Sequence, residues 1–259
     1  MSIPRRIHYC WLSDNPVPEH MKRNVEGWKK MLPDYEFIRW DLGRFEKDSS
    51  VWVSEAMEQK KYAFASDYIR LYAVYHFGGI YMDMDVEVRR PFDPLLDSHY
   101  MFAYETPDQK RIEAGCFGAE SHDPFLKACL DHYQGRHFVG KTGSPDMRPL
   151  SKVMYDIMNE NHFSPKIYSW DYFTAKTFAT GKVTPTGHTF AIHHFAGSWK
   201  SKKERRVMVK ARGIRKAHPV TGKAVAFVYE KVNIAILAVK EGGIRGLGCR
   251  VKHYIEGRR

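Results

Sequence analysis

Two aspartates separated by one residue lie in an apolar stretch of the sequence. The segment GGIYMDMDVEV (residues 78–88) has the composition of a strand entering the core, and it carries Asp83 and Asp85. Side chains of a strand alternate between its two faces, so both carboxylates are expected on one face. Converging carboxylates repel each other unless a cation lies near them, and open sets of oxygen ligands suit Mg²⁺ or Mn²⁺. The spacing predicts a divalent metal site, for which we favour Asp85 as the direct ligand; the alternative is a strand end whose acids are only hydrated.

A second charged pair precedes this strand. The run AFASDYIRLYAVYH (residues 63–76) has the three- to four-residue apolar spacing of a helix, which Gly78 and Gly79 end. Asp67 and Arg70 lie three residues apart and share one face of that helix. The short glycine turn could return them to the aspartates, and otherwise they form an ordinary surface ion pair.

The segment HHFAGSWK (residues 193–200) offers further ligands. A neutral imidazole of His193 or His194 is a suitable third ligand for a divalent metal, and Lys200 could neutralise a phosphate. The alternative is a structural loop without a ligand.

The elements around these residues alternate along the chain. The helices are expected at residues 20–32, 51–61, 63–76, 124–133 and 150–159. The strands are expected at residues 5–12, 33–41, 80–88, 99–104 and 114–119. The β-α-β-α order at the start predicts an α/β fold with a parallel sheet covered by helices.

The charge of the chain is concentrated at one end. The formal net charge is +11, yet residues 200–259 contain 17 Lys and Arg against 4 Asp and Glu, and residues 1–199 contain 24 against 26. We therefore expect a catalytic domain over residues 1–199 and a basic, helical extension over residues 200–259. The extension could bind an anionic membrane surface or pack on the first domain with its cations solvated. Nucleic-acid binding is a third reading, but no recognised motif accompanies the charge.

The cysteines and the apolar segments of the sequence indicate where in the cell the protein is expected. Cys10, Cys116, Cys129 and Cys249 show no CxxC spacing, so reduced thiols are expected. The N-terminal segment lacks the apolar stretch of a signal peptide, and the aliphatic run at residues 234–239 is far too short to span a bilayer. These features predict a cytoplasmic protein, with a peripheral position on the inner face of the cell membrane as a further possibility.

One long motif resembles a known family. The run KKYAFASDYIRLYAVYHFGGIYMDMDVEV, with IPRRIHYCW before it and HHFAGSW after it, is similar to glycosyltransferase family 32, the DXD sugar-binding group of capsule and polysaccharide transferases. It resembles more distantly the catalytic domain of clostridial glucosylating toxins. The likeness covers roughly residues 3–199 and implies a GT-A type fold, a Rossmann-like mixed sheet that binds a nucleotide sugar.

The resemblance also implies roles for single residues. Asp83 and Asp85 match the DXD pair that holds Mn²⁺ and the donor diphosphate or ribose. Asp67 and Arg70 match the pair that grips the hydroxyl groups of the donor sugar. Trp11 matches a tryptophan that stacks on uracil, although without the family it could equally be a core aromatic residue.

The end of the region is similar to a different family of retaining galactosyltransferases, family 8. The segment HFAGSWK fits their H-x-x-G-x-x-K pattern, in which the histidine completes the metal shell and the lysine contacts the diphosphate. By this likeness His194 is the third metal ligand and Lys200 a donor-binding residue. The Pro-Trp that usually follows the lysine is missing, so His193 remains the alternative ligand.

Together these likenesses imply a retaining hexosyltransferase. The expected donor is UDP-galactose or another UDP-hexose, and glucose, N-acetylglucosamine and mannose remain open. The expected acceptor is a glycan, lipid-linked, in capsule, exopolysaccharide or O-antigen synthesis. Glu105 and Glu113 are expected to be loop or surface acids, and neither is assigned as a nucleophile.

Two other classes of protein share features with this sequence. A DxD pair also opens phosphatases of the haloacid dehalogenase type, but there it ends the first strand, whereas Asp83 follows about 80 residues of α/β sequence. A basic membrane or nucleic-acid adaptor without catalysis is the other alternative. Manganese-dependent hydrolysis of a UDP-hexose distinguishes all three.

Overall fold

The chain divides into two compact units. The computed structural model describes residues 2–141, 143–197, 202–218 and 221–256. Unit 1 comprises residues 1–176 and 183–195, and unit 2 comprises residues 177–182 and 196–259. The domain boundary expected at residue 199 falls among residues 198–201, which lie outside the described ranges, as does Lys200.

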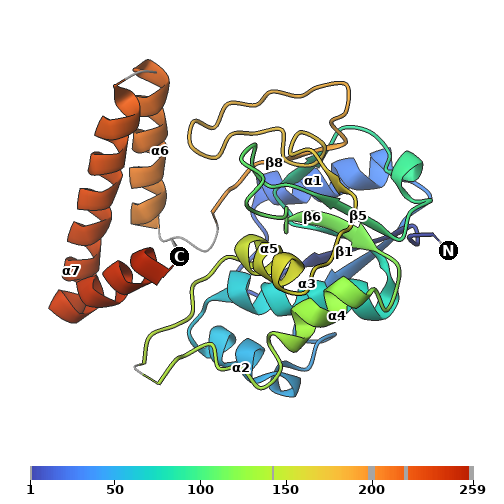
Figure 1. Cartoon of the computed structure of the whole chain (residues 1–259), viewed down its shortest axis with the longest axis horizontal. Coiled ribbons are helices and arrows are strands. Elements are labelled where there is room, and N and C mark those ends of the chain that lie inside the picture. The colour runs from blue at the N-terminus through green and yellow to red at the C-terminus, as the bar shows by residue number, and fades with distance from the viewer. Residues whose placement is uncertain (1, 142, 198–201, 219–220, 257–259) are drawn as a thin grey trace. The chain divides into compact units, whose positions relative to one another are not determined.

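Unit 1 is built on a six-stranded sheet in the order β2-β1-β3-β6-β5-β7 (Figure 1). The strands are β1 (Arg6–Cys10), β2 (Glu36–Trp40), β3 (Gly79–Met82), β5 (Tyr100–Ala103), β6 (Cys116–Ala119) and β7 (Ile167–Tyr168). β1 runs parallel to β2 and β3, whereas β6 runs antiparallel to both β3 and β5. The expected α/β fold with a mixed sheet is confirmed: β2, β1 and β3 are parallel to one another, β6 is antiparallel to both of its neighbours, and β7 pairs parallel with β5 at the other edge.

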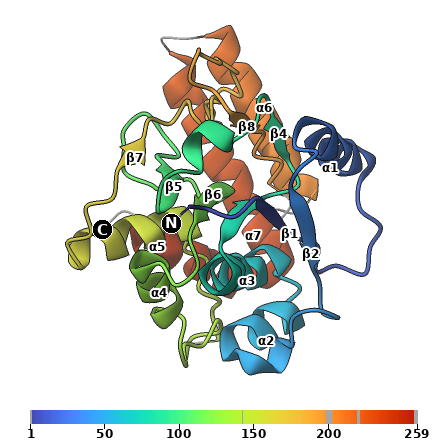
Figure 2. The ribbon, with the colours of Figure 1, turned by 90° about the vertical axis from the view of Figure 1, so that its right-hand side faces the viewer.

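Helices cover both faces of this sheet. They are α1 (Glu19–Met31), α2 (Val51–Glu58), α3 (Tyr62–Phe77), α4 (Pro124–Asp131) and α5 (Leu150–Glu160), with short 3₁₀ turns at Lys47–Ser49 and Asp93–Leu95. α2 to α5 lie on one face and α1 on the other (Figures 1 and 2). The main core fills the first layer, where Trp52, Leu71, Phe117, Leu126 and Met154 are all buried.

α3 is the helix that leads into the site. Residues on several of its sides are buried, as expected for a helix that is apolar nearly all round. It ends at Gly78, whose φ of 62° is costly for other residues and whose N–H donates to the carbonyl of Val74 at 2.8 Å. Gly79 follows so close to β1 that an added Cβ would lie 2.6 Å from the carbonyl oxygen of Arg6. The two glycines therefore allow the tight return from α3 into β3.

The single strand expected over residues 80–88 is wrong. β3 ends at Met82, a turn follows over residues 83–85, and β4 (Val86–Val88) pairs antiparallel with β8 (Ala191–His193) in a separate two-stranded sheet. The N–H of Val86 donates to the carbonyl of Asp83 at 2.9 Å and closes the turn. Both aspartates therefore lie in a turn between two sheets, and strand alternation does not explain their proximity.

Unit 2 contains two antiparallel helices, α6 (Lys202–Ala217) and α7 (Gly222–Glu256). Ala211 and Ala226 are fully buried, and Arg215 pairs with Glu230 at 2.8 Å. Within the described part of the chain, no helix combines the length and apolar character that crossing a membrane requires.

Candidate active site

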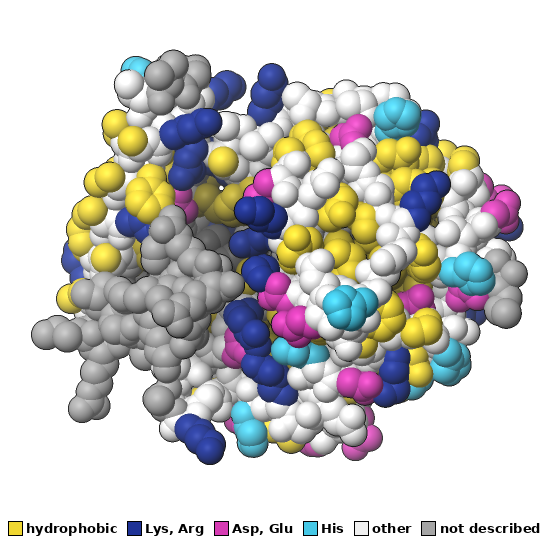
Figure 3. All heavy atoms as spheres, in the orientation of Figure 1, with side chains coloured by type: hydrophobic (Ala, Val, Ile, Leu, Met, Phe, Trp, Pro, Cys, Tyr) yellow, Lys and Arg dark blue, Asp and Glu magenta, His cyan; other side chains and the backbone are white. Residues whose placement is uncertain are grey.

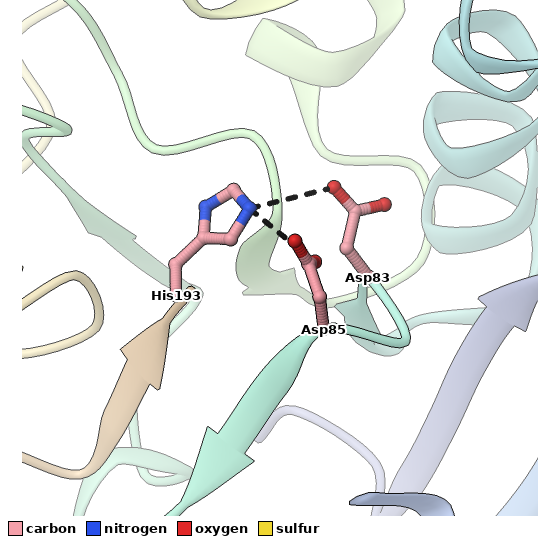
Figure 4. A group of neighbouring side chains, drawn as sticks. All are labelled: Asp83, Asp85 and His193. Carbon is pink, nitrogen blue, oxygen red and sulfur yellow. Dashed lines mark ion pairs between the residues drawn. The ribbon is translucent and has the colours of Figure 1, made fainter. Parts of the chain in front are cut away.

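Three side chains with metal-binding atoms meet where β3, β4 and β8 end or begin. Asp83 follows β3, Asp85 precedes β4, and His193 is the last residue of β8 (Figure 4). Nε2 of His193 lies 3.5 Å from Oδ1 of Asp85 and 4.0 Å from Oδ2 of Asp83. One ligand atom from each residue lies within 4.8 Å of the others, and this is the cluster that the described residues offer for a metal ion.

The histidine of this cluster is His193, not His194. β8 pairs with β4 in a register that places His193 opposite Val86, directly beside the turn that holds the aspartates. Successive side chains of a strand point to opposite faces, so His194 turns away. Its Nε2 lies 2.9 Å from Glu87, and its Nδ1 lies 3.3 Å from Nζ of Lys176. The geometry therefore favours His193, the alternative candidate, over His194 as the third member of the cluster.

Gly115 provides the space in which the cluster forms. Its carbonyl accepts the N–H of Asp83 at 2.8 Å, so its backbone runs directly beside the turn. A Cβ at this position would lie 2.6 Å from Cε1 of His193 and 3.0 Å from Oδ2 of Asp83. The sequence interpretation missed this residue, although a glycine inside an expected strand, here residues 114–119, often marks a close approach.

Glu113 is the second residue that the sequence interpretation placed wrongly. It was expected to be a loop or surface acid, yet its side chain is fully buried. Oε1 lies 3.0 Å from Nδ1 of His193 and accepts the N–H of Gly115 at 2.6 Å, while Oε2 accepts the hydroxyl of Thr174 at 2.7 Å. An acid close to a glycine is a weak sequence signal, and its contact with residue 193 depends on tertiary structure.

The charges around His193 shift its pKa. Burial opposes the charged imidazolium, but the carboxylates of Glu113 and Asp85 outweigh it and hold the pKa of His193 well above its ordinary value. Burial likewise opposes the charge of Glu113, yet His193 and three hydrogen bonds keep the pKa of this carboxyl below its ordinary value. Glu113 is thus held in its charged form, whereas burial and the charge of Asp85 raise the pKa of Asp83 despite the nearby Arg70.

Arg70 and Asp67 lie beside Asp83, as expected, but Arg70 is engaged by the protein itself. Its Nε and Nη groups donate to the carbonyl and hydroxyl of Ser66 and to the carbonyl of Ala114, the last at 2.6 Å. Nη2 lies 3.2 Å from both Asp67 and Asp83. Nη1 also donates to Oδ2 of Asp83 at 3.3 Å, so each nitrogen of the guanidinium has a partner within the protein. Arg70 therefore holds Asp83, and its contact with a donor sugar stays a prediction.

Trp11 borders a pocket at the same edge of the sheet. The pocket has a volume of about 530 Å³ and is lined by residues 11–17, Arg39 and residues 41–43. These segments follow β1 and β2, whose carboxyl ends lie beside that of β3 because the three strands are parallel. Ligands of open α/β sheets bind outside the carboxyl ends of such strands. Trp11 is half-buried, and its indole N–H donates to the carbonyl of Asn15 at 2.8 Å.

Part of this chain matches a known protein-family model. Residues 18–102, a third of the chain, match the family model described as "glycosyltransferase sugar-binding region containing DXD motif". This stretch contains Asp67, Arg70 and both aspartates of the turn, whereas Trp11, Glu113 and His193 lie outside it.

Particular relatives are fungal enzymes. Inositol phosphoceramide mannosyltransferase 1 of Schizosaccharomyces pombe is 30% identical over 146 residues, which are 54% of this chain and 43% of that protein. Mannosyl phosphorylinositol ceramide synthase SUR1 of Saccharomyces cerevisiae is 31% identical over 144 residues, which are 53% of this chain and 37% of that protein. The matched region thus spans less than half the length of these relatives.

Solved structures with a related arrangement include two transferases. PaToxG glycosyltransferase has a TM-score of 0.46 and 18% identity, covering 62% of this chain and 75% of that chain. The galactosyltransferase LgtC in complex with donor and acceptor sugar analogs has a TM-score of 0.43 and 13% identity, covering 74% of this chain and 87% of that chain.

Proposed function

We propose that this protein is a metal-dependent glycosyltransferase that moves a hexose from a nucleotide sugar to an acceptor. The observation that carries the proposal is the convergence of Asp83, Asp85 and His193 at the carboxyl edge of the parallel strands. The two aspartates also lie within the matched DXD region. A donor whose diphosphate reaches a metal at this cluster would extend its base towards the pocket beside Trp11.

The residues of the cluster fit a divalent cation. Two carboxylate oxygens and one imidazole nitrogen suit Mn²⁺ or Mg²⁺, and the missing side chain of Gly115 leaves room for His193 and Asp83 to lie close together. When bound, the cation stabilises the negative charge that develops on the leaving diphosphate. Arg70 and the hydroxyl of Tyr81, at 2.8 Å, orient Asp83, so the first carboxylate is already positioned for binding.

The donor sugar and the stereochemistry belong to the proposal. The fungal relatives are named as mannosyltransferases, which favours a mannosyl donor over the galactosyl donor expected from the sequence. Retention of the anomeric configuration follows from the family resemblance, and NMR of the product measures it. Replacement of Trp11 by Ala should weaken nucleotide binding while Trp11→Phe restores most of it, because stacking on a base needs an aromatic face.

The acceptor in this proposal is a glycan carried on a lipid, and unit 2 supplies the membrane contact. Aliphatic side chains of α7 recur every three to four residues and are 42–58% exposed: Val225, Val228, Val232, Ile236 and Val239. Hydrophobic side chains of unit 2 are visible at the surface in Figure 3. The net charge of +13 over residues 200–259 disfavours self-association and complements an anionic membrane surface, so a peripheral position on the inner face of the cell membrane is proposed.

Vesicle flotation tests the membrane contact. The full chain should float with phosphatidylcholine vesicles that contain phosphatidylglycerol and not with phosphatidylcholine alone, and added salt should weaken the binding. The double variant Val228→Glu/Val232→Glu should lose flotation, whereas Val51→Glu, at a comparably exposed valine of unit 1, should keep it. Equal flotation of all three proteins, or dimerisation through α7, would contradict this contact.

A donor panel tests the enzymatic proposal. The protein should hydrolyse one of UDP-galactose, UDP-glucose, UDP-N-acetylglucosamine or GDP-mannose with Mn²⁺, and EDTA should abolish the reaction. Asp85→Ala should remove turnover, while Asp97→Ala, a change at an exposed acid, should not. Hydrolysis of simple phosphomonoesters with Mg²⁺ would indicate the phosphatase, and neither activity would indicate a non-enzymatic adaptor.

A further inference from the structure

Glu113 is a buried carboxylate that the proposed reaction does not yet use. Its side chain is fully enclosed, and burying a carboxylate is costly unless it is paired and hydrogen-bonded. Three groups satisfy it, namely the ring of His193, the N–H of Gly115 and the hydroxyl of Thr174. A buried carboxylate with three partners beside a candidate metal ligand suggests that Glu113 has a function at the site.

The contact with His193 determines what the imidazole can offer. An ionised carboxylate only accepts hydrogen bonds, so Nδ1 of His193 must be the donor in the 3.0 Å contact with Glu113. When a cation displaces the proton of Nε2, the lone pair that binds it therefore belongs to Nε2. This is the nitrogen that faces Asp85 at 3.5 Å and Asp83 at 4.0 Å.

Thr174 holds both partners of this contact. Its hydroxyl donates to Oε2 of Glu113 at 2.7 Å, and its carbonyl accepts the backbone N–H of His193 at 3.2 Å. Glu113 in turn is anchored through its own N–H to the carbonyl of Ala103 on β5. The imidazole also packs against the ring of Phe195, with centroids 4.2 Å apart. The orientation of His193 is therefore set by contacts on several of its sides.

We propose that Glu113, held by Thr174, is a positioning residue that orients His193 and directs its Nε2 to the divalent cation bound by Asp83 and Asp85. Carboxylates that accept the second N–H of a metal-binding histidine fix its tautomer and raise its basicity, and their loss typically weakens metal binding by about 10- to 100-fold. This inference rests on the proposed metal site and adds residues outside the matched DXD region to it.

Titration calorimetry with MnCl₂ alone tests the inference without any sugar donor. Glu113→Gln keeps the size of the side chain and can keep its hydrogen bonds, so the fold should survive while the charge is lost. We expect Mn²⁺ affinity to fall by about 10-fold or more in this variant, and by less in Thr174→Val. The matched control is Glu120→Gln, which removes a carboxylate paired with another histidine, His99, and should leave Mn²⁺ affinity unchanged.

A double-mutant cycle separates positioning from general electrostatics. In the His193→Asn background, Glu113→Gln should have little further effect on Mn²⁺ affinity, because the residue acts through the imidazole. An unchanged affinity in folded Glu113→Gln, or an equal loss in the His193→Asn background, would overturn the inference. If the unaltered protein binds no Mn²⁺, the proposed metal site fails first, so the two failures are distinguishable.

Discussion

Nη2 of Arg70 lies 3.2 Å from Oδ1 of Asp83, so a buried guanidinium supports the first aspartate of the DXD turn. The same nitrogen lies 3.2 Å from Asp67, and the guanidinium carbon lies 4.5 Å from the centre of the Tyr81 ring. Burial and the charge of Asp83 act in opposite directions on Arg70, and the neighbouring acids leave its pKa raised. An ion pair thus links α3, which carries Arg70, to Asp83 directly after β3.

Removal of this guanidinium should destabilise the fold strongly. Arg70→Met would leave the buried Asp67 and the partly buried Asp83 without their cation, and breaking a buried pair from one side typically costs about 3–5 kcal/mol. Urea denaturation measures the loss. Arg5→Met breaks the exposed pair with Asp93 and should change stability little, so equal midpoints for the two variants would contradict the assigned role.

The two adjacent histidines should respond differently to the same substitution. His193→Asn removes the nitrogen that faces the aspartates, and we expect at least a tenfold loss of Mn²⁺ affinity and of metal-dependent donor hydrolysis. His194→Asn removes a contact with Glu87 and should change Mn²⁺ affinity far less. Calorimetry and hydrolysis assays on both variants check the assignment, and a larger effect at residue 194 would restore the expectation from the sequence.

A methyl group at residue 115 should damage the site selectively. The added Cβ of Gly115→Ala would lie 2.6 Å from Cε1 of His193, so the imidazole must move away from the aspartates. We expect weakened Mn²⁺ binding together with a folded circular dichroism spectrum. Gly27→Ala in α1 meets no atom within 4 Å and should stabilise the protein by up to about 1 kcal/mol without changing Mn²⁺ binding. Unimpaired binding in Gly115→Ala would show that the space is not required.

His8 should make stability dependent on pH. It is buried on β1, where Trp40 donates to its Nδ1 at 3.0 Å and its Nε2 lies 2.9 Å from the carbonyl of Gly78. Burial lowers its pKa from 6.5 to about 4, so between these values the unfolded chain binds a proton that the folded chain does not. Stability from this group is therefore complete above about pH 6.5 and is lost as the pH falls towards 4, by roughly 3 kcal/mol.

The measurement for His8 is a series of urea midpoints between pH 4 and pH 7. His8→Gln should be less stable than the unaltered protein at pH 7, and the difference should shrink as the pH falls. A constant difference across the range would show that His8 does not titrate as its surroundings indicate.

Helices and strands were largely predictable because their signals are local. The expected helix at residues 63–76 is α3, Tyr62–Phe77, since an apolar run followed by two glycines has both a periodicity and an end signal. The single strand expected over residues 80–88 was wrong because its end is set by pairing with a distant strand and not by a local signal. Apolar residues continue through Met84 and Val86, and only the pairing of β4 with β8 shows that the chain leaves the main sheet after Met82.

Some residues of the site were likewise predictable from local sequence patterns, and others were not. A DXD spacing and an Asp-x-x-Arg pair ahead of two glycines are sequence patterns, and they located Asp67, Arg70, Asp83 and Asp85 without coordinates. Glu113, Gly115 and Thr174 carry no comparable pattern, and the choice between His193 and His194 depends on strand register. One residue of register turns a side chain to the other face of a strand.

The sequence by itself determined the α/β class, the chemistry offered by the two aspartates and the order of the elements up to α5 apart from the break between β3 and β4, because periodicity and residue type act locally. Tertiary structure alone decided that the aspartates lie in a turn between two sheets and that His193 faces them. It also placed Glu113, which lies 80 residues before His193 in the chain, within hydrogen-bonding distance of that imidazole. The physical reason is that a site forms from side chains whose separation is set by strand pairing and burial, and these contacts join residues with no shared local signal.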